Sequence, residues 1–116
     1  MEEGRRRDKQ SGRRRRIVRR YRTLPIGVEV DGSIYKKFSI RPGTLRDSCA
    51  ALDEAGADAS PNVLRYATMA QRVTFEGLAQ EKVTVDLLMD MYDRDAVTLE
   101  NAAAEVEKKL DALSSS

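Results

Sequence analysis

The chain contains no histidine and no tryptophan, and it has a single cysteine, Cys49. Without histidine it lacks the commonest general base and the commonest metal ligand in proteins. One cysteine cannot form an intrachain disulfide or a CxxC metal site. Because no histidine is present to activate Cys49 as a nucleophile, we expect this residue to be a small apolar side chain on a helix face. We therefore expect a non-enzymatic protein without catalytic residues.

Long apolar runs are absent as well. No hydrophobic segment approaches the roughly 18 residues that span a membrane, and no apolar stretch follows the charged N-terminus as it would in a signal peptide. The chain also lacks the glycine-rich GxxxxGKS/T and GxGxxG patterns that bind phosphates. We expect a protein of cytosolic type that has no cofactor and no membrane partner.

Aspartates form the one potential ligand set in the sequence. Asp86, Asp90, Asp93 and Asp95 lie close together in the chain, and carboxylate oxygens are the ligands that Mg²⁺ and Ca²⁺ prefer. The segment lacks the alternate spacing, the central glycine and the closing glutamate of a calcium-binding loop. Asp93 or Asp95 is better explained as the N-cap of a helix, so we assign no metal site.

The charge of the chain changes sign near Arg22. Residues 1–22 contain ten arginines and one lysine against three acidic residues, a net charge of +8, whereas residues 23–116 contain ten basic and sixteen acidic residues, a net charge of −6. We therefore divide the chain into a basic, Arg-rich arm (residues 1–22) and a body (residues 23–113). A body of about 90 residues is marginal as a self-sufficient core, which favours association with partners or with itself.

Three interpretations of the arm stay open. It is a solvated tail, a contact for nucleic acid, or a contact for an acidic protein surface. Its only aromatic residue is Tyr21, a small platform for base stacking, so nucleic-acid binding would tolerate any sequence. The arginines that we assign to either kind of contact are Arg13, Arg14, Arg15, Arg16, Arg19, Arg20 and Arg22.

The body begins with the clearest local pattern in the chain. Apolar residues alternate on both sides of Asp31-Gly32, at Leu24, Ile26, Val28 and Val30 before it and at Ile34, Phe38 and Ile40 after it. Period-two alternation around Asp-Gly predicts a β-hairpin over residues 23–41 that is closed by a primed turn. Because Pro25 has no N–H for a ladder hydrogen bond, we expect the first strand at a sheet edge.

About four helices are predicted over residues 45–113. Thr44 with Asp47 indicates a capping box, Ser60-Pro61 a second helix start, and Thr84 a third. The apolar faces predicted for the first, second and last helices are Leu45, Cys49 and Leu52; Val63, Ala67, Ala70 and Val73; and Leu99, Ala103, Val106, Leu110 and Leu113. Residues 74–82 stay ambiguous, with Gly77 indicating a break. The predicted fold class is α+β, with an N-terminal β-hairpin followed by about four α-helices.

Residues 23–27, 30–32 and 38–44 form a hairpin pattern and the helix start that follows it. In these segments the body resembles tail assembly proteins of Mu-like and related phages. Residues 83–95 resemble the short helix and the beginning of the final helix that close the family's pattern. The resemblance covers roughly residues 23–113 and leaves the arm unexplained.

This resemblance implies a tail assembly chaperone, a non-enzymatic protein that binds the long tape measure protein during tail morphogenesis. It implies action in the host cell cytoplasm and leaves retention in the virion tail and homo-oligomer formation open. Methionine side chains repack easily and suit an adaptable helix-binding surface, although they also fill cores. We therefore predict partner contacts at Tyr66, Met69, Met89 and Met91. The alternative is a structural virion component or a nucleic-acid-binding protein that uses the arm.

Overall fold

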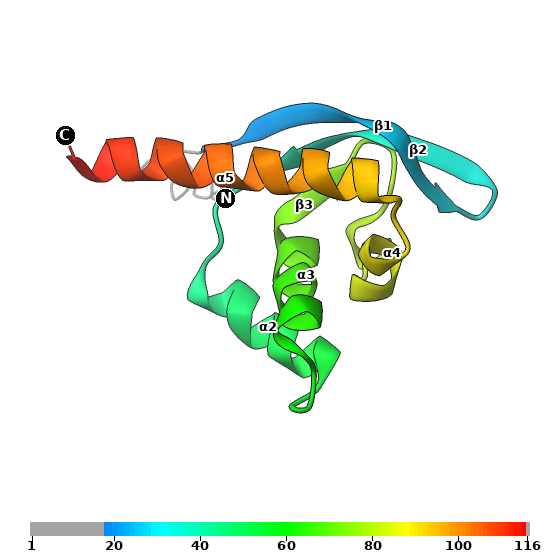
Figure 1. The fold of residues 1–116 in the computed structure, drawn as a ribbon, viewed down its shortest axis with the longest axis horizontal. Coiled ribbons are helices and arrows are strands. Elements are labelled where there is room, and N and C mark those ends of the chain that lie inside the picture. The colour runs from blue at the N-terminus through cyan, green and yellow to red at the C-terminus, as the bar shows by residue number, and fades with distance from the viewer. Residues whose placement is uncertain (1–17, 116) are drawn as a thin grey trace, which may run out of the picture.

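The computed structural model describes residues 18–115, with side chains as far as Leu113. Within this range, three strands form an antiparallel sheet in the order β1-β2-β3, and four α-helices follow the hairpin. The elements are β1 (Arg20–Val30), β2 (Ser33–Ile40), α2 (Leu45–Ala55), α3 (Pro61–Arg72), β3 (Val73–Phe75), the 3-10 helix η1 (Gln80–Lys82), α4 (Val85–Met89) and α5 (Asp93–Ser115). The predicted α+β class, with an N-terminal hairpin and about four helices, is confirmed (Figure 1).

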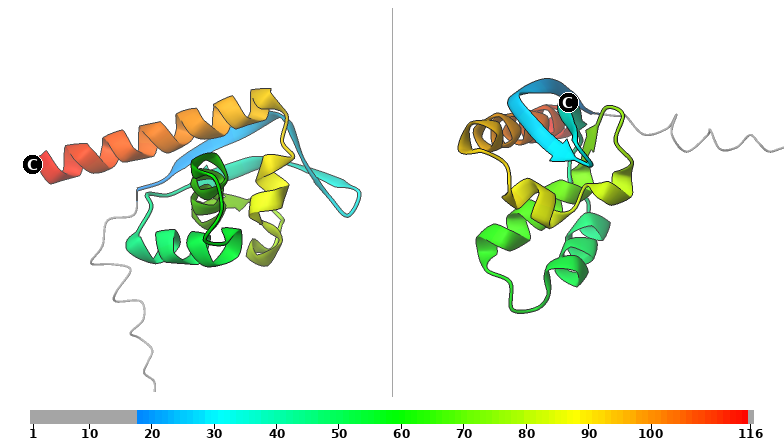
Figure 2. Two further views of the ribbon diagram at one scale, coloured as in Figure 1. Left: turned by 60° about the horizontal axis from the view of Figure 1, so that its bottom comes forward. Right: turned by 90° about the vertical axis from the view of Figure 1, so that its right-hand side faces the viewer.

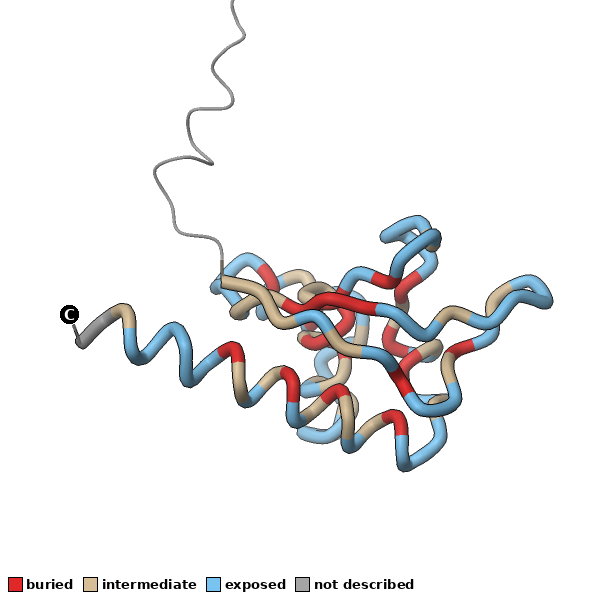
Figure 3. Tube along the Cα trace, turned by 90° about the horizontal axis from the view of Figure 1, so that it is seen from above, coloured by how far each residue is buried: buried red, intermediate tan, exposed pale blue. Residues whose placement is uncertain are grey.

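The helices gather on one face of the sheet, and the core lies between them and the strands. The long helix α5 runs along β1, while α3 and α4 approach the sheet from below in Figure 1. The buried core side chains come from all three strands and from α3, α4, α5 and the segment before α4: Leu24, Val28, Phe38, Ile40, Met69, Ala70, Val73, Phe75, Val83, Leu88, Leu99, Ala102 and Val106. Figure 3 shows that the buried positions recur along α5, whereas the tip of the hairpin is exposed.

The hairpin turn has the predicted geometry. Asp31 and Gly32 have φ angles of 52° and 84°, and a type I′ turn requires positive φ at both central residues. Strand pairing starts directly beside the turn, with Val30 opposite Ser33. The Asp-Gly pair therefore closes the hairpin where the alternation predicted it.

A break in the ladder divides β1 into two halves. The register shifts between Thr23 and Val28, and this shift overturns the simple alternation predicted for the strand. Val28 is buried as expected, but Ile26 is 39% exposed. Pro25 lies within the break, where its missing N–H costs no ladder hydrogen bond. The predicted edge position of the first strand is confirmed by the strand order.

Side-chain caps fix the predicted helix starts. The Thr44 Oγ1 accepts a hydrogen bond from the Asp47 N–H, and the Asp47 carboxylate accepts one from the Thr44 N–H, which completes the capping box of α2. Ser60 caps α3 with Pro61 in the first turn, and Thr84 caps α4. Each cap satisfies a helix N–H that has no partner within the helix.

The apolar face predicted for α2 is exposed rather than packed. Leu45 is 80% exposed and Leu52 is 48% exposed, and Cys49 also lies on the surface. The helix instead buries the side that carries Asp47. Arg41 explains this orientation, because its guanidinium donates two hydrogen bonds to the Asp47 carboxylate, at 2.7 and 2.8 Å. Ala51 on the same side packs with Ala67 of α3, so the ion pair and this small apolar contact together hold that side of α2 against the body.

Two further segments differ from the sequence-based expectation. Val73, predicted on the face of a helix, opens the short strand β3, and Phe75 of this strand lies opposite Phe38 of β2. The last helix begins at Asp93, so Asp93 and Asp95 are both residues of its first turn and neither is its cap. Both differences arise from contacts with β1 and β2, which are distant in the sequence.

Candidate functional site

Asp95 ties the start of α5 to the break in β1. Its side chain is 0% exposed, and its two carboxylate oxygens accept hydrogen bonds from the N–H groups of Ile26 and Gly27, each at 2.9 Å. These N–H groups lie where the ladder is interrupted, so the carboxylate takes the place of a strand partner. Sequence reasoning missed this role because the partners are 69 and 68 residues away along the chain.

Gly27 permits the close approach of β1 to β2 at the same break. Its φ is +106°, and a Cβ on it would lie 2.6 Å from Cγ2 of Ile34 and 2.9 Å from Cγ of Lys36. Glycine alone adopts this backbone conformation without a steric penalty and leaves room for both neighbours. The break therefore holds Ile26 at the surface, next to the projecting half of the hairpin.

A groove of about 400 Å³ lies between this part of the hairpin and the connection from α4 to α5. The groove is lined by Ile26, Gly27, Val28, Glu29, Ile34, Leu87, Asp90, Met91 and Tyr92. Several apolar side chains here are accessible: Ile34 is 53% exposed, Tyr92 is 65% exposed, and Met89, which precedes the connection, is 45% exposed. Exposed apolar side chains that gather in this way are typical of a surface that binds another protein.

The lining of the groove also carries acidic groups. Glu29 and Asp90 both belong to it, and both are exposed. Within residues 18–115, neither carboxylate forms an ion pair. An apolar segment flanked by basic residues is therefore complementary to the groove in both hydrophobicity and charge.

The four residues predicted to contact a partner are divided between the surface and the interior. Met91 lines the groove and Met89 is exposed two residues before it in the chain, whereas Met69 is 4% exposed and belongs to the core. Tyr66 of α3 donates a hydrogen bond from its hydroxyl to the Glu100 carboxylate on α5. Burial and this hydrogen bond raise the pKa of Tyr66 to about 12. The structure thus places Met91 in the groove and Met89 on the surface, and it uses Met69 and Tyr66 for contacts within the fold.

The arginines of the arm that the structure describes are engaged within the fold. Arg20 and Arg22 both donate to the Glu105 carboxylate of α5, at 2.8 and 2.7 Å, and these contacts lower the pKa of that carboxyl. Arg19 donates to the Ser39 Oγ at 3.0 Å. The strand β1 begins inside the stretch assigned to the arm because alternate arginines face α5. The remaining predicted contact residues, Arg13, Arg14, Arg15 and Arg16, lie outside the described residues.

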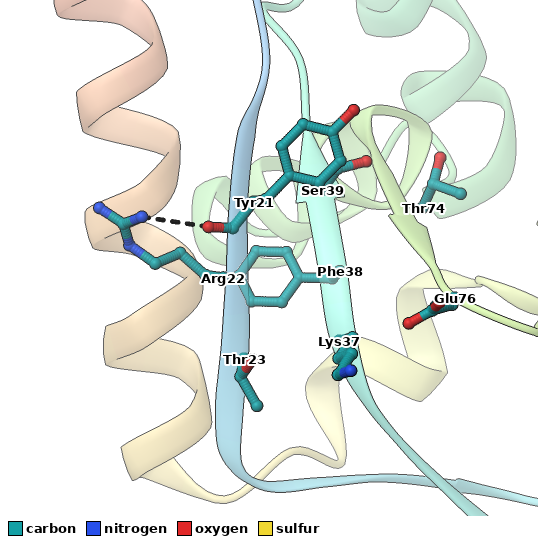
Figure 4. Close-up of a pocket in the computed structure, with 8 residues that line it drawn as sticks. All are labelled: Tyr21, Arg22, Thr23, Lys37, Phe38, Ser39, Thr74 and Glu76. Atoms are coloured by element: carbon teal, nitrogen blue, oxygen red, sulfur yellow. Dashed lines mark hydrogen bonds between the residues drawn. The ribbon is translucent and has the colours of Figure 1, made fainter.

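A second hollow, of about 410 Å³, lies over the three strands of the sheet. Figure 4 shows Tyr21, Ser39 and Thr74 in it, and strand pairing places these residues side by side across β1, β2 and β3. Lys37 and Glu76 bring opposite charges to the same hollow. Most of its lining residues have polar side chains, although the larger part of the surface exposed in the hollow is apolar, and it lacks the cluster of exposed aliphatic side chains found in the groove.

The described residues do not suggest a metal centre. Among residues 18–115, no three histidine, cysteine, aspartate or glutamate side chains are grouped as ligands of one ion. Of the four aspartates considered in the sequence, Asp95 uses both carboxylate oxygens on backbone N–H groups. The same part of the chain contains no helix that is long and apolar enough to cross a membrane.

Comparison with known proteins identifies no relative. No protein-family model matches the chain, and neither a curated protein nor a solved structure shows significant similarity to it. The choice of a candidate site therefore depends on the geometry of the groove and on the sequence motifs that form it.

Proposed function

We propose that this protein is a non-enzymatic assembly chaperone that binds a helical segment of a tape measure protein during phage tail morphogenesis. The observation that carries the proposal is the groove between the hairpin and the α4–α5 connection. Exposed apolar side chains gather there beside Glu29 and Asp90, which form no ion pair with any residue that the structure describes. The resemblance to tail assembly proteins supports the same function. Both stretches that resemble that family, the hairpin and residues 83–95, contribute residues to the groove.

The physical requirements of such a partner fit this surface. A tape measure protein is a long helical chain, and its apolar faces aggregate when they are uncovered before the tail tube forms. An amphipathic helix binds by laying its apolar face into a hydrophobic groove. Glu29 and Asp90 favour a helix that carries lysine or arginine beside that face.

Co-expression with the candidate tape measure protein tests the proposal. The candidate to be sought for this test is a very long helical protein encoded in a neighbouring reading frame. We expect a soluble complex with several copies of this chain for each partner. Ile34→Glu places a charge among the apolar groove residues, and we expect it to weaken binding at least tenfold, or about 1.4 kcal/mol.

Val97→Glu provides the matched control. Val97 is 57% exposed on α5 and does not line the groove. Its replacement adds the same charge to an equally accessible apolar position, so binding should be unchanged. The proposal fails if the two proteins elute separately and the partner's solubility is unaffected, or if both substitutions weaken binding equally.

A further inference from the structure

The outer face of α2 carries an apolar stripe that no element in the described fold covers. Leu45, Cys49 and Leu52 follow one another at i, i+4 and i+7, so they share one side of the helix. Leu45 is 80% exposed and Leu52 is 48% exposed, and Cys49 is exposed between them. Apolar residues at this spacing form the seam along which a second helix packs.

The position of α2 makes the stripe accessible. The opposite side of the helix packs against α3, where Ala51 meets Ala67 in a small second core cluster. Figures 1 and 2 show α2 at the periphery of the molecule, away from the sheet and from α5. The stripe is therefore a surface separate from the groove beside the hairpin.

The charges beside the stripe indicate what covers it. Arg46 and Asp53 are seven residues apart, so they lie on the same side of the stripe, one toward each end of the helix. Both are exposed, and neither forms an ion pair within residues 18–115. This flank of the helix is positive at one end and negative at the other. When two identical helices pack antiparallel, the positive end of each flank lies beside the negative end of the other, so the charges are complementary.

We propose that two copies of this chain associate through α2, with the helices antiparallel about a two-fold axis at Cys49. In this arrangement Leu45 of each copy packs beside Leu52 of the other, and Arg46 of each copy lies beside Asp53 of the other. The two Cys49 side chains meet at the axis. Because α2 has only 11 residues, the interface is small and the dimer is weak and reversible. The inference makes no use of the groove and is independent of the proposed function.

Oxidative cross-linking tests this geometry with the unmodified full-length chain. Cys49 is the only cysteine, so a disulfide induced by copper phenanthroline can join two copies only through this residue. A disulfide requires the two Cα atoms to lie within about 7 Å. We expect a covalent dimer to form readily, and to form much more slowly in a control that carries Cys49→Ser and Asn101→Cys. Asn101 is exposed on α5, so the control thiol is accessible but lies away from the stripe.

A charge exchange tests the pairing of Arg46 with Asp53. Arg46→Glu and Asp53→Lys each create two like-charge contacts in a symmetric dimer, and each should raise the dissociation constant measured by sedimentation about tenfold. Combined in one chain, the two substitutions restore opposite charges across the axis. The double variant should therefore associate within about threefold of the original chain. Loss of association through local unfolding would not be reversed by the second substitution.

The apolar stripe is tested by Leu45→Glu, which should abolish dimer formation, with Val97→Glu as the exposed control that retains it. Circular dichroism checks that each variant is folded. The proposal is overturned if the original chain stays monomeric at millimolar concentration and Cys49 cross-links no faster than the Asn101→Cys control. A dimer that tolerates Leu45→Glu, or a double charge variant that is not rescued, also overturns it. Ile34→Glu should dimerise normally, so a failed groove and a failed dimer give different results.

Discussion

At the scale of single residues, Asp95 is a buried carboxylate whose partners are two backbone N–H groups rather than a cation. Burying a charged group is costly unless its hydrogen-bonding capacity is used, and here each oxygen has a donor. The two N–H groups depend equally on the carboxylate, because the register shift in β1 interrupts their ladder. Loss of either acceptor would leave an N–H without a partner in the interior.

Asp95→Asn should therefore lower the free energy of unfolding by about 2–3 kcal/mol, because the amide presents NH₂ to one of the two backbone donors. Urea unfolding should show a lower midpoint with an unchanged slope. Asp93→Asn is the control, since Asp93 is exposed at the start of the same helix, and it should change stability by less than about 0.5 kcal/mol. Equal effects of the two substitutions would contradict the role assigned to Asp95.

Asp47 is a second residue whose ionisation contributes to stability. The hydrogen bond from Arg41 is the main cause that lowers its pKa to about 2, with a further contribution from the Thr44 N–H. An unfolded aspartate titrates near pH 3.9, so the folded state favours the ionised form. The resulting stabilisation is fully present above the unfolded pKa and is lost as the pH falls through the folded pKa.

As the pH falls from 5 to 2, protonation of Asp47 alone should lower the free energy of unfolding by up to about 2 kcal/mol. The Asp47→Asn variant is less stable at neutral pH but should lack this part of the acid-induced loss. Thermal unfolding of both proteins across the pH range gives the comparison. Parallel pH profiles for the two proteins would show that the Asp47–Arg41 pair does not contribute as the contacts indicate.

At the scale of elements, the hairpin contains two glycines with positive φ and different surroundings. A Cβ at Gly27 would lie 2.6 Å from Ile34, whereas a Cβ at Gly32 would have nothing within 4 Å. Gly32→Ala should cost about 1 kcal/mol from backbone strain alone. Gly27→Ala adds a steric clash and should cost about 2–4 kcal/mol.

Chemical denaturation of the two alanine variants measures this difference. Because both substitutions introduce the same side chain at positive φ, each serves as the control for the other with respect to backbone strain. Similar losses of stability at both positions would show that the close approach of β1 to β2 at Gly27 is not required for the fold.

Elements defined by neighbouring residues could be predicted from the sequence. The Asp31-Gly32 turn and the Thr44, Ser60 and Thr84 caps are confirmed because each depends on hydrogen bonds or φ angles within a few residues. The orientation of α2 could not be predicted in this way. Its apolar stripe favoured burial, but the helix instead buries Asp47, which pairs with Arg41, and Ala51, which packs against α3.

The candidate site, too, could be predicted only in part from the sequence. Met89 and Met91 could be proposed as contact residues from their side-chain chemistry. Met91 lines the groove, and Met89 is exposed two residues before it in the chain. Met69 has identical chemistry but is in the core, and nothing local distinguishes it. The groove itself depends on the break in β1, and the Asp95 contact that holds this break crosses most of the body.

At the scale of the whole molecule, the arm and the body meet inside β1 rather than at Arg22. Deletion of residues 1–17 leaves Arg20, Arg22 and the whole of β1 in place, and it is the control for a longer deletion. Deletion of residues 1–22 also removes the two arginines that pair with Glu105 and the first three residues of β1, which lie opposite Ile40, Ser39 and Phe38. The longer deletion should lower the melting temperature by several degrees, about 4–8 °C for each kcal/mol lost.

The same two deletions test whether the arm is a solvated tail, a contact for nucleic acid or a contact for an acidic protein surface. Binding to nucleic acid through arginines falls steeply with salt, with a slope set by the number of phosphates neutralised. If residues 1–17 make that contact, their removal should abolish nucleic-acid binding and leave binding to the tape measure protein intact. Equal melting temperatures for the two deletions would contradict the structural role of Arg20 and Arg22.

The contact between Asp95 and β1 also affects the order in which parts of the chain can fold during synthesis. During synthesis the hairpin leaves the ribosome well before Asp95, which follows its backbone partners by 69 and 68 residues. Until then Leu24 and Val28 have no α5 to cover them, and contacts between such distant parts of a chain form late in folding. Both walls of the groove are therefore complete only after the start of α5 has been synthesised, so a nascent chain cannot engage a partner there before that helix has emerged.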